Sequence, residues 1–152
     1  MIKILCVGKI KEDFFTSGIK EYQKRIEGFS KFSIVEVKEV NTLDISKNIE
    51  EEGKNILSKI ADDEFVITLE IKGKAIDSVE LAKLIEEKFT YGVSKITFVI
   101  GGSNGLSESV SKRSDYRLSF SKFTFPHQLM RLILTEQIYR AITIIKNKEY
   151  HK

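Results

Sequence analysis

The chain has 152 residues, of which 41% are hydrophobic and 31% are charged, and its formal net charge is +3. This size and composition favour a single domain over residues 1–152, and the short apolar run at the start argues against a signal peptide or a membrane span. One cysteine and two histidines exclude an internal disulfide and give no cluster at metal-ligand spacing, so we expect a cytoplasmic protein without a metal centre.

The first part of the chain alternates between strand and helix patterns. Continuous apolar runs or alternation of apolar with charged residues indicate strands, whereas apolar residues three and four apart indicate amphipathic helices. On these patterns we predict strands over 2–7 and 33–40 and helices over 15–29 and 45–60. Gly28 is expected to end the first helix, and Asp44 or Ser46 to cap the second.

The same alternation continues to the end of the chain. We predict strands over 65–69, 96–100 and 116–120, a short helix around Val110 capped by Ser107, and helices over 77–89 and 126–146. Residues 70–74 are expected to form a loop around Gly73, and Asp77 with Glu80 has the spacing of a capping box. The segment 96–100 is the most continuous apolar strand and is therefore placed near the centre of the sheet.

Strands and helices in alternation predict an α/β fold, with a mostly parallel sheet flanked by helices on both faces. Ligands of such sheets usually bind beyond the carboxyl ends of central strands. Here two of those ends are Leu69 and Ile100, and both are followed by segments that contain glycine. A site is therefore expected where these strands end.

Two segments of unusual composition follow the predicted strands. Residues 101–105 read GGSNG, and glycines let the backbone turn sharply and approach a flat ligand closely. Residues 120–125 combine three phenylalanines with Ser121, Lys122 and Thr124, ahead of the only proline. Alone, the first is a tight turn as often as a binding loop, and the second could be an apolar connection packed on the core. Together they favour a binding site.

Positive charge is concentrated near the C-terminus. Residues 112–152 carry nine Lys or Arg against three Asp or Glu, whereas residues 1–111 carry sixteen against nineteen. Such a cluster attracts polyanions such as nucleic acid, although a solvated helix face is an equal alternative. On the last helix, Glu136 and Arg140 are spaced to face each other. Tyr150 and His151 have no obvious packing role, so they either contact a substrate or form an inert terminus.

Several motifs together resemble one known family. They are GGSNGL at 101–106, SFSKFTFPHQLMR at 119–131, EQIYRA at 136–141 and YHK at 150–152, with VGK at 7–9 and TLEIKGK at 68–74. The chain resembles the RlmH family, the SPOUT-class methyltransferases that modify a pseudouridine in bacterial 23S ribosomal RNA. The resemblance covers the whole length and is most specific from Phe98 onward.

The resemblance implies a SPOUT-type α/β fold whose C-terminal part forms a trefoil knot and binds S-adenosylmethionine. It also implies a homodimer with the site near the subunit interface. Carried over by position, the cofactor contacts are Leu69, Gly101, Phe120, Ser121, Lys122, Phe123, Thr124 and Phe125.

The implied reaction transfers a methyl group to N3 of the pseudouridine, with the 23S rRNA of the assembled ribosome as the expected substrate. N3 must lose a proton, which requires a base or a group that stabilises the anion. We expect His151 and Tyr150 to contact the target base, with His151 as the leading base, and Arg140 to orient the base or bind phosphate. His127 is a weaker candidate. The alternatives are a SPOUT enzyme that acts on another RNA, such as tRNA, and a non-catalytic RNA-binding module.

Overall fold

A computed structural model describes residues 1–152. Its centre is one five-stranded sheet in the order β2-β1-β4-β3-β5, and every strand pair is parallel. The strands are β1 (Ile2–Val7), β2 (Phe32–Val37), β3 (Phe65–Ala75), β4 (Ile96–Ile100) and β5 (Tyr116–Ser119). The predicted parallel α/β sheet is confirmed, and the apolar strand 96–100 is the middle one of the five.

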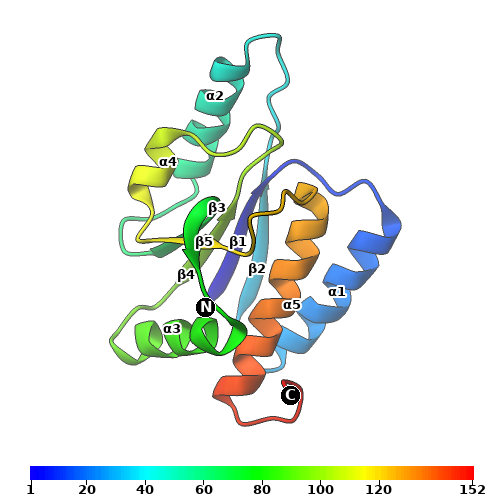
Figure 1. The fold of residues 1–152 in the computed structure, drawn as a ribbon, viewed down its shortest axis with the longest axis vertical. Helices are drawn as coiled ribbons and strands as arrows, with labels where there is room; N and C mark the ends of the chain where they lie inside the picture. The colour runs from blue at the N-terminus through cyan, green and yellow to red at the C-terminus, as the bar shows by residue number, and fades with distance from the viewer.

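Five helices cover the two faces of this sheet (Figure 1). They are α1 (Asp13–Glu27), α2 (Ile45–Leu57), α3 (Ser78–Thr90), α4 (Glu108–Arg113) and α5 (His127–Ile145). One core cluster joins α1, α3 and α5 to the sheet, and a second joins α2 and α4 to its opposite face. Ile4 belongs to the first cluster and Leu5 to the second, because successive strand side chains point to opposite faces. No helix is both long and apolar enough to cross a membrane.

The predicted caps explain where the helices begin and end. The Asp44 carboxylate accepts a hydrogen bond from the backbone N–H of Lys47, so Asp44 rather than Ser46 caps α2. Asp77 and Glu80 form the reciprocal capping box of α3. Ser107 caps α4, and Gly28 follows the last residue of α1. These local signals are therefore confirmed.

The predicted loop over residues 70–74 is wrong, because β3 continues to Ala75. Leu118 of β5 pairs with Leu69 and also with Lys74, so the residues between them are out of register with β5. A Cβ atom at Gly73 would lie 2.8 Å from the carbonyl carbon of Arg117. Gly73 thus serves a close approach of two strands rather than a turn.

Two strands and two helices are shorter than predicted, and α5 begins at His127 and ends at Ile145, one residue inside each predicted bound. β2 ends at Val37 instead of residue 40, because the backbone beyond it bonds to α2: the Val40 N–H donates to Glu52 at 2.9 Å and the Thr42 N–H to Asn48 at 2.9 Å. β5 ends at Ser119 and α2 at Leu57. A hydrophobic pattern alone does not reveal such competing side-chain acceptors.

A buried polar network ties together the amino ends of three strands. The Lys3 ammonium lies 3.0 Å from the Glu64 carboxylate, and both side chains are less than 10% exposed. Thr97 donates to the same carboxylate at 2.5 Å. Burial alone would raise the pKa of Glu64, but hydrogen bonds from Thr97 and Lys3 hold that pKa below its usual value.

Cys6, the only cysteine, is buried in β1. Its thiol lies 3.5 Å from the carbonyl oxygen of Val35. Burial raises the pKa of this thiol to about 12, so the reactive thiolate is scarce at neutral pH. The thiol therefore behaves as a small apolar group of the core.

Candidate functional site

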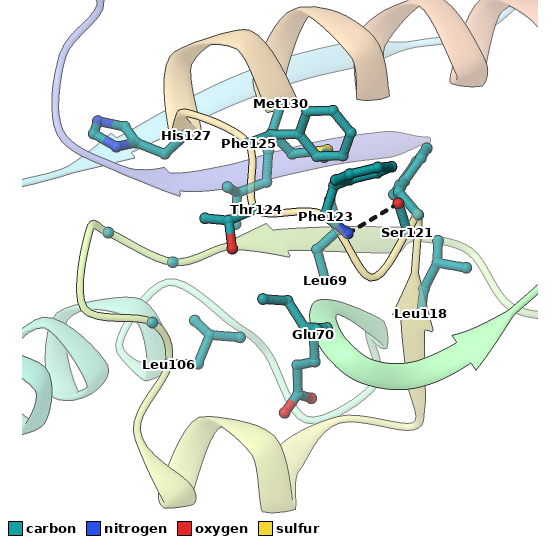
Figure 2. A pocket seen from close by; sticks show the side chains of 16 residues that line it. Leu69, Glu70, Leu106, Leu118, Ser121, Phe123, Thr124, Phe125, His127 and Met130 are labelled. Carbon is teal, nitrogen blue, oxygen red and sulfur yellow. Dashed lines mark hydrogen bonds between the residues drawn. The ribbon is translucent and has the colours of Figure 1, made fainter.

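A pocket of about 150 Å³ lies at the carboxyl ends of β3, β4 and β5, where it is covered by the segment that leads into α5 (Figure 2). Of the eight residues expected to contact a cofactor, the pocket is lined by Leu69, Gly101, Phe120, Ser121, Phe123, Thr124 and Phe125. Lys122 is exposed and does not line it. The fold therefore brings together the ends of strands that are distant in the sequence.

The glycine segment after β4 is folded tightly on itself. Gly102 and Gly105 form an isolated bridge, in which the Gly105 N–H donates to the Gly102 carbonyl at 3.0 Å. A Cβ atom at Gly101 would lie 2.9 Å from the carbonyl carbon of Gly105, and Gly105 has a φ of +85°. Both positions therefore require glycine, one for space and one for backbone conformation. The result is a pocket wall made of backbone.

Phenylalanines dominate the opposite wall, which residues 120–125 form. The Ser121 hydroxyl accepts a hydrogen bond from the Phe123 N–H at 3.0 Å, and the Ser121 carbonyl accepts one from Ser119 at 3.2 Å. Figure 2 shows Phe123 and Phe125 on the side of the pocket opposite Glu70 and Leu106. The Phe123 side chain is 78% exposed. An exposed aromatic ring beside backbone polar groups is suited to a flat, partly apolar ligand.

Several further lining residues were not among the predicted cofactor contacts. Ile100, Gly102 and Gly105 belong to the strand end and glycine segment where a site was expected, and the others are Glu70, Ile71, Leu106, Leu118 and Met130. Glu70 is the one carboxylate among them. It accepts hydrogen bonds from Thr68 at 2.6 Å and from Ser111 at 2.7 Å. Its position directly after the strand end at Leu69 was the signal that could have identified it.

His127, a weaker catalytic candidate, also lines the pocket from the first turn of α5. Figure 2 shows its ring at one edge of the pocket, away from Phe123. The next residue, Gln128, accepts a hydrogen bond from the Lys11 N–H at 3.2 Å, which ties the start of α5 to the segment after β1. This geometry suits His127 for shaping the pocket mouth as well as for contact with a substrate.

The other three catalytic candidates form a second cluster at the far end of α5. One Glu136 oxygen accepts hydrogen bonds from Arg140 at 2.6 and 3.0 Å and from the Tyr150 hydroxyl at 2.9 Å. The predicted pairing of Glu136 with Arg140 is thus confirmed. Arg140 also contacts His151, with 3.3 Å between a guanidinium nitrogen and Nδ1. This set is named the tail cluster: Glu136, Arg140, Tyr150 and His151.

The expectation that Tyr150 lacks a packing role is wrong. Asn147 has a φ of +52°, and this left-handed conformation lets the chain turn back after α5. The Tyr150 ring then packs edge-on against Tyr139, with centroids 4.8 Å apart. Burial, followed by hydrogen bonds with Tyr22 and Glu136, raises the pKa of the Tyr150 hydroxyl. Tyr150 therefore remains a neutral hydrogen-bond donor.

The contact of His151 with Arg140 is compatible with one tautomer of the ring. Arginine has only donors, so a hydrogen bond at this contact requires Nδ1 of His151 as the acceptor and the ring proton on Nε2. The ring is exposed to solvent. Nδ1 can therefore accept a proton if another N–H group replaces Arg140 as its partner.

A single chain does not join this tail cluster to the pocket. His127 is the first residue of α5 and Arg140 lies thirteen positions later, so a rise of about 1.5 Å per residue separates them by about 20 Å along the helix. Figure 1 shows the C-terminus beside the end of α5 that lies away from the pocket segment. Of the predicted catalytic residues, only His127 lies at the pocket. No group of three or more His, Cys, Asp or Glu side chains is placed to hold a metal.

Comparisons with known proteins agree on the family of the chain. A family model described as "Predicted SPOUT methyltransferase" matches residues 1–151. Proteins named ribosomal RNA large subunit methyltransferase H are similar over 99% of both chains, with 49% identity in Carboxydothermus hydrogenoformans and 53% in Limosilactobacillus reuteri. The solved structure of a probable methylase family protein from Haemophilus influenzae has a similar fold. Its TM-score is 0.56 and its identity 17%, over 99% of this chain and 70% of that one.

Proposed function

Because the chain belongs to the SPOUT methyltransferase family, we propose that it uses S-adenosylmethionine to methylate N3 of a pseudouridine in the ribosomal RNA of the large subunit. The observation that carries this proposal is the pocket at the ends of β3, β4 and β5 in a chain about half identical, over its full length, to proteins named for that RNA. The assembled ribosome in the cytoplasm is the proposed substrate.

The pocket residues fit the cofactor. Leu69 and the backbone of Gly101 line the pocket, and residues 120–125 add aromatic rings to it. Such a lining can recognise an adenine ring by its edge and its faces at once. When bound, S-adenosylmethionine supplies a methyl group on a positively charged sulfur. The surrounding residues must hold it in line with the nucleophile, because alignment is the main source of rate in a direct displacement.

The tail cluster is proposed to prepare the nucleophile. The imide N3–H of pseudouridine is a donor, so it can take the place of the Arg140 N–H at Nδ1 of His151, and Nδ1 then accepts the proton. Arg140 is held by the two hydrogen bonds that it donates to Glu136, and its positive charge can stabilise the anion that forms. Tyr150 lies against Arg140, with 4.7 Å between the guanidinium carbon and the ring centroid, and can contact the base.

The separation of the two regions supports a homodimer as part of this proposal. The tail cluster lies about 20 Å along α5 from the pocket of its own chain, so we place it at the pocket of the partner subunit. Each of two equivalent sites would then combine one subunit's pocket with the other subunit's tail cluster. The proposal includes one SPOUT domain over residues 1–152 and a trefoil knot formed by the pocket segments and α5.

The decisive experiment supplies methyl-labelled S-adenosylmethionine to the protein together with ribosomes. Ribosomes with and without prior pseudouridylation are compared, and the labelled nucleotide is mapped. We expect label at one pseudouridine of the large subunit and little label without pseudouridylation. Label on tRNA alone, or cofactor binding without any transfer, would contradict the proposal. The latter result would favour a non-catalytic RNA-binding module.

A further inference from the structure

A second pocket, of about 320 Å³, lies between α1, β2 and α5, beside the first turn of α5. Six of its nine lining residues are polar: Lys9, Thr16, Lys20, Gln23, Glu36 and Arg131. Three of these are cationic and one is anionic, which leaves a net charge of +2 (three minus one). Lys9 and Lys20 are exposed, so their ammonium groups are free to meet a ligand.

Arg131 is the buried member of this pocket, with a side chain only 3% exposed. Its Nη1 donates to Glu36 at 2.7 Å and its Nη2 to the Gly8 carbonyl at 3.0 Å. Its Nε is the one buried side-chain nitrogen or oxygen without a hydrogen-bond partner. A buried donor that lacks a partner is unfavourable, and more so on a charged group, so an external acceptor that reaches this nitrogen would stabilise the pocket.

We propose that this pocket binds a phosphate group of the RNA backbone, with Arg131 at its base and Lys9 and Lys20 at its rim. Phosphate oxygens are acceptors only, and arginine and lysine donors are their usual partners in proteins. Thr16 and Gln23 add neutral side chains that can donate hydrogen bonds. The pocket thus fits a phosphate better than an apolar or cationic ligand.

The position of the pocket relates it to the methylation site. His127 and Met130 line the cofactor pocket, and Arg131 of the same helical turn lines the second one. His127 and Arg131 are four residues apart and are therefore neighbours on the helix surface, so a phosphate held here would be close to a nucleotide at the cofactor pocket. The inference rests on the proposed action on RNA, and it assigns to this pocket the role of positioning the RNA strand.

The test is RNA binding by a double variant, Lys9→Ala with Lys20→Ala. The control, Lys54→Ala with Lys83→Ala, removes two exposed helical lysines that have no ion-pair partner and do not line either pocket. The probe is a labelled RNA oligonucleotide with the sequence around the target pseudouridine, titrated at several salt concentrations. We expect the first variant to bind about tenfold more weakly. The plot of its log K against the logarithm of the salt concentration should have a slope smaller in magnitude by about 1. The control should change neither.

A second readout follows Arg131 directly. In nitrogen-15-labelled protein, its Nε–H resonance should shift when the RNA oligonucleotide is added, and should shift much less in the Lys9→Ala, Lys20→Ala variant. An unshifted resonance, or equal salt slopes in the two variants, overturns the inference. The outcomes remain separate from those of the proposed function. If the wild-type protein transfers methyl groups but the two double variants have equal salt slopes, only the phosphate pocket is rejected. If the slopes differ as expected but no methyl group is transferred, only the enzymatic proposal is rejected.

Discussion

The two ends of the sheet are built on different principles. At the carboxyl end, glycine backbone and aromatic side chains form an open pocket with few side-chain hydrogen bonds. At the amino end, Lys3, Glu64 and Thr97 are buried and bonded to one another, and the tail cluster packs beside the end of α5. The difference indicates that the carboxyl end is kept free to admit a ligand, while the buried network of Lys3, Glu64 and Thr97 holds the strands in place.

The largest expected effect is on stability and concerns the amino end. Glu64→Gln leaves the buried Lys3 without its counter-charge, which should lower the free energy of unfolding by about 3 kcal/mol. Urea denaturation measures this change. Cofactor affinity at low temperature should stay at the wild-type value. A variant that loses both stability and cofactor affinity would contradict the independence of the two ends.

The same substitution should change the response to pH. The pKa of Glu64 is lowered in the folded protein, so the stability it contributes is present above its unfolded pKa, near 4.5, and is lost as the pH falls through the lower folded value. The unfolding free energy of the wild type should therefore fall over this acidic range more steeply than that of Glu64→Gln. Parallel curves for the two proteins would contradict this assignment.

At the carboxyl end, Gly101→Ala should reduce methyl transfer by about 100-fold. The new Cβ would lie 2.9 Å from the backbone of Gly105, so the pocket wall must move. A misplacement of reacting groups by about 1 Å lowers a rate by about 100-fold. Single-turnover rates and calorimetric cofactor titration measure the loss. Gly28→Ala is the control, because Gly28 has a helical φ of −66° and should accept a methyl group with little effect.

Glu136→Gln should lower the single-turnover methylation rate about tenfold without changing cofactor affinity. Glutamine keeps the shape of the side chain but lacks the negative charge that holds Arg140 and strengthens the hydrogen bond from Tyr150. The split between rate and affinity distinguishes positioning of the target base from damage to the pocket. Glu21→Gln, which breaks an exposed pair with Arg25, is the matched control and should leave both quantities unchanged.

The smallest signal comes from mixing two inactive proteins, Gly101→Ala and a chain without residues 150–152. If each site combines the pocket of one subunit with the tail of the other, half of the randomly mixed dimers regain one good site, which restores about a quarter of the wild-type activity. Activity that stays at the level of the separate variants would place the pocket and the tail in the same chain.

The strand pattern predicted where the pocket lies. The carboxyl ends of parallel strands meet at one edge of the sheet, so a site was expected where Leu69 and Ile100 end their strands. The network of Lys3 with Glu64 joins positions far apart in the chain and leaves no periodic signal. The packing of Tyr150 depends on the turn at Asn147, whose left-handed conformation is unusual for a residue other than glycine. Contacts set by such turns require the structure.

The buried thiol of Cys6 makes the protein convenient for optical measurements. With its pKa raised to about 12 and its sulfur enclosed, Cys6 should resist alkylation under native conditions. A cysteine introduced for the exposed Phe123 would then be the single site for a maleimide dye, without replacement of Cys6. Fluorescence from that position would report on the mouth of the pocket as ligands enter and leave.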